Sequence, residues 1–105
     1  MKVFLDDERV TPEGWIRVYW PEEAIELLKT CQVELISLDH DLGNDARGTG
    51  YDVLLWIEKE VVESGFNPPE MFVHSSNASA RLKMGSAINQ IIKLSHARLV
   101  KKSTV

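Results

Sequence analysis

Short apolar runs alternate with longer amphipathic segments along this chain. Runs that are rich in aliphatic, aromatic or β-branched residues, as buried β-strands are, occupy residues 2–5, 15–20, 33–38 and 71–73. Apolar residues recur at helical spacing in the segments that begin at Pro21, Thr49 and Asn77. Because strands alternate with helices, we expect right-handed crossovers and a mostly parallel α/β sheet of strand order 2-1-3-4, with helices on both faces.

Local signals set the ends of the predicted helices. Asn77 is a good N-cap for the last helix. Thr49 and Asp52 are spaced as a capping box, and Gly65 is placed to end the helix that they begin. Residues 97–101 carry a weak strand pattern, which leaves room for a short fifth strand.

The composition indicates one cytoplasmic domain that spans residues 1–105. Hydrophobic residues make up 44% of the chain and charged residues 27%, and no apolar run is long enough to cross a membrane. The single cysteine, Cys31, fits a reducing compartment. The formal net charge of −4 argues against binding of long nucleic acids, which requires many phosphate contacts, but it is compatible with a small phosphorylated ligand.

Acidic residues gather where the predicted strands end. Asp6 and Asp7 follow the first strand, and Asp39 and Asp41 follow the third. Ligands of open α/β sheets bind at the C-terminal ends of the strands, so we expect these carboxylates to share one site. Carboxylates this close repel each other unless a cation or hydrogen bonds compensate. The pattern therefore predicts a site for Mg²⁺ or Mn²⁺, which prefer oxygen ligands.

Two histidines follow strands that should be neighbours in the sheet. His40 lies between Asp39 and Asp41, and His74 follows the strand at 71–73. Imidazole titrates near neutral pH, so such a pair can act as general base and general acid. We expect both side chains to face one pocket and to bracket a phosphate, with Asp39 as a third catalytic group.

Residues near the start of the last predicted helix suit phosphate binding. Ser75, Ser76 and Asn77 offer hydroxyl and amide groups beside free helix N–H groups, although helix capping is an equally good explanation of them. Arg81 lies one turn further along, and Arg9 follows the first acidic pair. Either guanidinium could bind a phosphate bidentately, so these five residues form the candidate substrate-binding set.

Three segments together resemble the receiver domains of response regulators. Val3–Glu8 resembles their first strand, and Leu35–Gly43 resembles their third, with Asp39 in the phosphoacceptor position. Met71–Ser76 resembles their fourth strand. The chain departs from the ordinary receiver pattern in four ways: the first helix is shortened to a loop, a histidine follows Asp39, a histidine enters the fourth strand, and no Lys-Pro pair ends a fifth strand.

These departures resemble a divergent branch, the cyclic-phosphate processing receiver-like domains. The combination LDDER, SLDHDLG, GYDV and HSSN, followed by Arg81 and Met84, resembles that family over nearly the whole chain. The resemblance implies a flavodoxin-like receiver fold. It also implies a role on cyclic phosphates, in RNA-end repair or in the processing of ADP-ribose cyclic phosphates.

Three functions are therefore open. The favoured one is a metal-assisted phosphodiesterase that opens the cyclic phosphate of a nucleotide, an RNA end or ADP-ribose. The second is a single-domain response-regulator receiver phosphorylated on Asp39, and the missing Lys that normally senses the phosphoryl group counts against it. The third is a pseudo-receiver that binds a protein partner and carries no catalytic chemistry.

Overall fold

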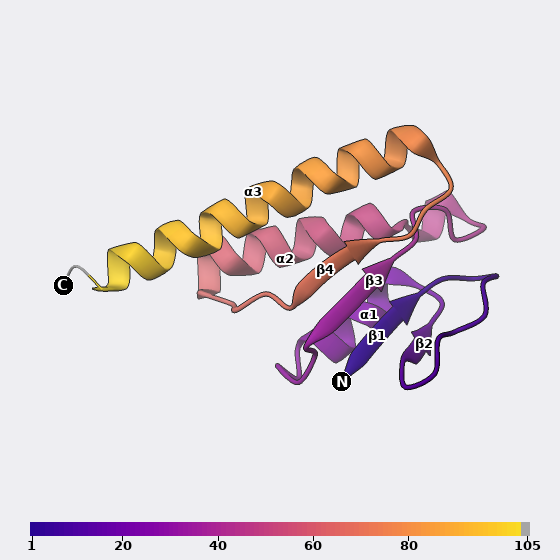
Figure 1. Ribbon diagram of the computed structural model, residues 1–105, viewed down its shortest axis with the longest axis horizontal. Coiled ribbons are helices and arrows are strands. Elements are labelled where there is room, and N and C mark those ends of the chain that lie inside the picture. Colours follow the sequence, from indigo (N-terminus) through magenta and orange to yellow (C-terminus); the bar gives the residue numbers. More distant parts are fainter. Residues whose placement is uncertain (104–105) are drawn as a thin grey trace.

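The computed structural model describes residues 1–103, with side chains described through residue 99 (Figure 1). The strands span Lys2–Leu5 (β1), Ile16–Val18 (β2), Leu35–Leu38 (β3) and Glu70–Val73 (β4). The α-helices span Pro21–Leu28 (α1), Gly50–Ser64 (α2) and Ala78–Ser103 (α3). A single 3₁₀ turn, η1, spans Asp45–Arg47 in the loop between β3 and α2.

All pairings in the sheet are parallel, and the strand order β2-β1-β3-β4 confirms the predicted topology. The register places Leu5 of β1 beside Leu38 of β3, and Leu38 beside Val73 of β4. These three residues end their strands, so the three strands finish level with one another. Whatever follows them in the chain therefore emerges at one edge of the sheet.

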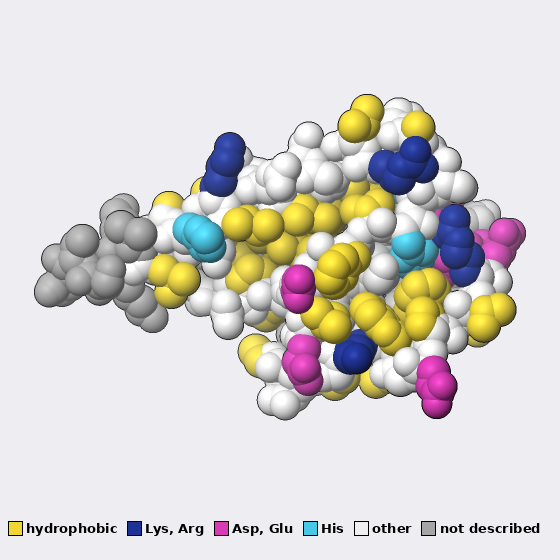
Figure 2. Space-filling model, viewed as in Figure 1, with side chains coloured by type: hydrophobic (Ala, Val, Ile, Leu, Met, Phe, Trp, Pro, Cys, Tyr) yellow, Lys and Arg dark blue, Asp and Glu magenta, His cyan; other side chains and the backbone are white. Residues whose placement is uncertain are grey.

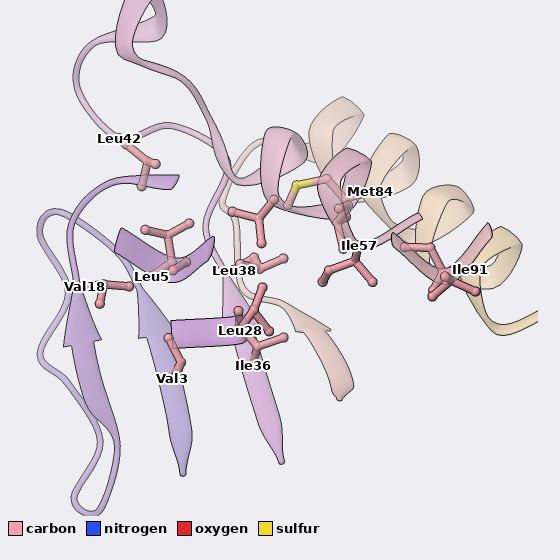
Figure 3. Close-up of a cluster of buried hydrophobic side chains, with 14 residues drawn as sticks. Val3, Leu5, Val18, Leu28, Ile36, Leu38, Leu42, Ile57, Met84 and Ile91 are labelled. Carbon is pink, nitrogen blue, oxygen red and sulfur yellow. The ribbon is translucent and has the colours of Figure 1, made fainter. Parts of the chain in front are cut away.

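One face of the sheet carries the hydrophobic core. Val3 and Leu5 of β1 and Ile36 and Leu38 of β3 are fully buried, in one cluster with residues from all three α-helices (Figure 3). Because strand side chains alternate between faces, Phe4 and the other intervening residues point to the opposite face.

The position of the helices differs from the expectation of helices on both faces. In Figure 1 the strands lie in front of α1 and α2, and α3 packs beside α2 and the β4 edge. The reason is that residues 6–15, which connect β1 to β2, form a loop without a helix. The uncovered face is rich in hydrophobic side chains (Figure 2), and Phe72 on it remains 43% exposed.

The predicted helix signals are confirmed. The Thr49 hydroxyl accepts a hydrogen bond from the Tyr51 N–H at 3.3 Å, and the Thr49 N–H donates to Asp52 Oδ2 at 2.8 Å. Gly65 ends α2 in the left-handed conformation with φ 68°, which costs glycine little. Asn77 Oδ1 accepts the Ala80 N–H at the start of α3.

The predicted fifth strand is wrong, because residues 97–101 continue α3. Leu94 still packs against the core, and the Arg98 guanidinium donates to the carbonyl oxygens of Val61 and Val62 at the end of α2. These contacts favour continuing the helix along α2 over a turn back to the sheet. Within residues 1–103, no helix is long and apolar enough to span a membrane.

Candidate functional site

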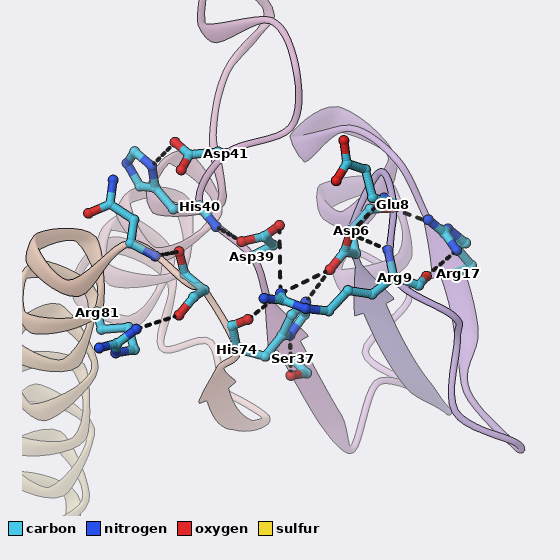
Figure 4. A network of polar contacts seen from close by, with 12 residues as sticks. Asp6, Glu8, Arg9, Arg17, Ser37, Asp39, His40, Asp41, His74 and Arg81 are labelled. Atoms are coloured by element: carbon cyan, nitrogen blue, oxygen red, sulfur yellow. Dashed lines mark hydrogen bonds and ion pairs between the residues drawn. The ribbon is translucent and has the colours of Figure 1, made fainter.

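The level strand ends bring three ionisable residues together. Asp6 follows β1, Asp39 follows β3 and His74 follows β4 (Figure 4). One ligand atom from each residue lies within 4.8 Å of the other two. Asp6 is 1% exposed and Asp39 8%. A pocket of about 280 Å³ opens over these carboxylates, and its lining consists of Asp6, Asp7, Glu8, Arg9, Asp39, Asp41, Gly43 and Ser76.

Asp6 is a buried carboxylate with a full set of donors. Its Oδ1 accepts the backbone N–H groups of Glu8 at 2.8 Å and Arg9 at 3.0 Å, and its Oδ2 accepts from His74 Nε2 at 2.9 Å. Burial raises the pKa of Asp6, but the backbone N–H donors and His74 outweigh it and leave the pKa below its ordinary value. Asp6 is therefore an anion that organises its neighbours.

Arg9 supplies the positive charge beside the two buried carboxylates. Its Nη1 lies 3.4 Å from Asp6 Oδ2 and 3.9 Å from Asp39 Oδ2, and it donates to the His74 carbonyl oxygen. Arg17 holds the turn that presents it, because its guanidinium donates to the carbonyl oxygens of Asp6 and Arg9. The Arg9 side chain remains 44% exposed, so it can also meet an anion in the pocket.

Asp39 differs electrostatically from Asp6. Its Oδ1 accepts the His40 N–H at 2.8 Å, while its Oδ2 lies on the Arg9 side. Burial and the negative charge of Asp6 raise the pKa of Asp39 above its ordinary value, more than the His40 N–H lowers it. Asp39 is thus the more basic of the two buried carboxylates, and it is the better proton acceptor.

His74 is held on three sides. Its Nε2 meets Asp6, and its Nδ1 lies 2.7 Å from Ser37 Oγ. Its ring stacks on Phe4. Burial lowers the pKa of His74 below 6.5, despite the opposing effect of the nearby Asp6 carboxylate. The imidazole at this site is therefore neutral at physiological pH.

His40 does not converge with His74 as the sequence led us to expect. Its Nδ1 lies 2.8 Å from Asp41 Oδ1, and Figure 4 shows its ring apart from the Asp6–His74 pair. The His40 backbone N–H donates to the Asp39 carboxylate, whereas the His40 side chain contacts Asp41. His40 contributes a backbone donor to the site, and its imidazole forms a separate pair with Asp41.

The remaining candidate residues divide into pocket and scaffold. Asp7, Asp41 and Ser76 line the pocket. In contrast, Ser75 is buried, its hydroxyl accepts the Asn77 N–H, and its carbonyl accepts from Arg81. Together with the Asn77 cap at the start of α3, these contacts show three predicted phosphate binders engaged in local structure.

Ser37, Phe4 and Arg17 belong to the site but escaped the sequence-based prediction. Ser37 is the one polar residue within the apolar β3 run, and it is 8% exposed. A buried hydroxyl in such a run requires a partner, which is a usable signal for a functional contact. Nothing local in the sequence indicates that Phe4 meets His74, because that contact depends on the pairing of β1, β3 and β4.

A comparison with protein families identifies one match. The family model described as the cyclic-phosphate processing receiver domain matches residues 1–90, a range that contains every residue of the site. No curated protein and no solved structure matches the chain significantly.

Proposed function

The chain belongs to the cyclic-phosphate processing receiver domain family, and from this premise we propose that it adds water to a cyclic phosphate carried by a nucleotide, an RNA end or ADP-ribose. The observation that carries the proposal is the pocket over Asp39, in which an arginine is the nearest cation to a pair of buried carboxylates. That arrangement offers a phosphate both a charged donor and an adjacent base.

The proposed reaction uses three side chains. Arg9 binds the non-bridging phosphate oxygens with charge-assisted hydrogen bonds. Asp39 takes a proton from the attacking water as the new phosphorus–oxygen bond forms. One ring phosphorus–oxygen bond then breaks, and Asp39 returns the proton to the departing alkoxide, so that the net change is the addition of one water. The neutral His74 stabilises the charge on Asp6 through its Nε2–H.

The donor set also fits a divalent cation, and we include Mg²⁺ or Mn²⁺ in the proposal. Asp6 and Asp39 would hold such an ion through carboxylate oxygens that lie within 4.8 Å of each other, and Asp7 lines the same pocket. A bound ion would supply positive charge to the phosphate oxygens. Asp39 Oδ2 can serve either as a ligand of the ion or as the proton acceptor of the reaction, so these two roles must be distinguished.

The test is hydrolysis of 2′,3′-cyclic nucleotides and of ADP-ribose cyclic phosphate by the wild type, Asp39→Asn and Arg9→Ala. We expect Asp39→Asn to lower kcat by roughly 10²–10⁴-fold, as removal of a general base does, and Arg9→Ala to raise KM. Asp45→Asn is the matched control, because Asp45 is an exposed acid in η1 and does not line the pocket. Inactivity of the wild type on every cyclic phosphate would reject the proposal in favour of a protein-binding role.

A metal titration followed by NMR separates the two roles of Asp39. If Asp39 is the proton acceptor, Asp39→Asn keeps the affinity for Mg²⁺ or Mn²⁺ and loses turnover. If Asp39 is a ligand, the same variant loses both. Amides near Asp6 and Asp7 should shift on addition of the metal, and the absence of any shift would remove the ion from the proposal.

A further inference from the structure

We propose that the open face of the sheet is an interface for a second copy of this chain. The two copies pack face to face about a two-fold axis that runs along β3. This inference goes beyond the proposed function and does not depend on it. It rests on the side chains that the strand register places on the open face and on the arrangement of their charges.

The register sets two rows of side chains on the open face. Partner residues of parallel strands point to the same face, so one row contains Lys2 of β1, Leu35 of β3 and Glu70 of β4. The next row on that face contains Phe4 of β1 and Phe72 of β4. Each row therefore has one member on β1 and one on β4, on either side of the central strand β3.

The apolar members of these rows are incompletely covered within one chain. Phe72 is 43% exposed, and Leu35 is half-buried. Trp15 is half-buried and lies against Phe4. Figure 2 shows hydrophobic side chains gathered over the strands on this face, with charged side chains beside them. A contiguous apolar patch with a charged rim is typical of an interaction surface.

Two opposite charges flank this patch and have no partner in the chain. Lys2 and Glu70 are both exposed, and neither takes part in an ion pair among residues 1–99, whose side chains the structure describes. They lie in one row, two strands and therefore about 10 Å apart. A partner that covers the patch should carry an acid and a base at the same spacing, and a second copy of the face supplies both.

The two-fold axis along β3 makes the face complementary to itself. It places β1 of one copy over β4 of the other, so Lys2 lies opposite Glu70 at two symmetric positions. Leu35 then meets Leu35, and Phe72 meets Phe4 with its neighbour Trp15. An axis across the strands would instead place each strand over its own counterpart and bring like charges together when the rows coincide. Packed sheets keep their strands within about 30° of each other at about 10 Å separation, which fits the first arrangement.

The small size of the face makes this a weak, reversible dimer. The strands are three or four residues long, so four of them cover roughly 250 Å² at about 4.8 Å between strands and about 3.3 Å per residue. Stable complexes bury about 800 Å² per partner. The strands run in the same direction in both copies, so the two pockets over Asp39 open at the same end of the dimer.

The experiment is sedimentation velocity of the full chain from about 10 µM to about 1 mM, the range in which weak complexes form. The average mass of the wild type should rise with concentration. Lys2→Glu and Glu70→Lys should each raise the dissociation constant by about tenfold or more, because like charges then face each other. The double variant Lys2→Glu/Glu70→Lys should dimerise like the wild type, because the swap restores complementary charges. Lys59→Glu is the matched control, since Lys59 is exposed on α2, behind the sheet.

Two further measurements locate the interface. Phe72→Ala should weaken the dimer, and the amides of Leu35 and Phe72 should show concentration-dependent NMR shifts. A wild type that stays monomeric throughout the series would overturn the proposal and leave the face to a different partner. A dimer that is indifferent to both single charge reversals would also overturn it. So would a double variant that melts like the wild type but dimerises no better than the single variants.

Discussion

The imidazole of His74 lies flat on the phenyl ring of Phe4, with ring centroids 4.3 Å apart and ring planes 2° from parallel. The two residues are 70 positions apart in the chain: Phe4 lies in β1, His74 directly follows β4, and β3 runs between these two strands. Trp15 also contacts Phe4, in an edge-to-face arrangement with ring centroids 6.3 Å apart. An aromatic layer on the open sheet face therefore supports the polar cluster at the strand ends.

Replacing Phe4 should loosen His74. We expect Phe4→Ala to lower the free energy of unfolding by about 3–5 kcal/mol, because Phe4 is only 6% exposed, and Phe4→Leu to lower it less. Both variants remove the aromatic ring current, so the ring protons of His74 should shift in both. Urea denaturation and proton NMR measure the two effects. Unmoved His74 ring signals in Phe4→Leu would show that the stack does not exist in solution.

Gly50 should tolerate no side chain. A Cβ there would lie 1.9 Å from the carbonyl oxygen of Asp39, so α2 would have to move away from the site. We expect Gly50→Ala to lower the free energy of unfolding by about 3 kcal/mol. Gly85→Ala is the matched control, since its Cβ would meet no atom within 4 Å, and in α3 it should stabilise by roughly 0.5–1 kcal/mol. Equal melting temperatures for the two variants would contradict this prediction.

The capping box of α2 should contribute measurably to stability. Thr49→Ala removes the hydroxyl that accepts the Tyr51 N–H and should cost about 1 kcal/mol in the free energy of unfolding. Thr49→Ser keeps the acceptor oxygen and should stay close to the wild type. Thermal denaturation of the three proteins checks the prediction, which fails if the serine variant is as unstable as the alanine variant.

The buried imidazole should make folding depend on pH. The pKa of His74 is below 6.5 in the folded protein, because burial disfavours the charged ring. The unfolded chain therefore binds more protons than the folded protein between the folded-state pKa and 6.5, and the free energy of unfolding falls as the pH drops through that window. His74→Gln lacks this group, so its urea midpoint should fall less steeply over the same window. Parallel pH profiles for the two proteins would contradict the assignment.

The sequence predicted the strands, their order and the edge at which the polar residues collect. These features follow from local patterns, because apolar runs, capping residues and alternation of strands with helices are written in neighbouring positions. The acidic pair after β1 and the residues Asp39 and His74 were expected to meet at the strand ends, and the structure brings Asp6, Asp39 and His74 together there. The sequence also predicted the helix caps at Thr49 and Asn77.

Only the tertiary structure decided which side chains face one another at that edge. The expected pairing of His40 with His74 did not form. The His40 backbone N–H donates to Asp39, and the His40 ring contacts Asp41. The contacts of His74 with Ser37 and Phe4 depend on the register of three strands, and that register is set by packing against α1, α2 and α3. Residue types and their spacing predict which chemical groups lie at the strand ends. The partners of each group depend on contacts between distant segments, and these contacts exist only after the sheet has assembled.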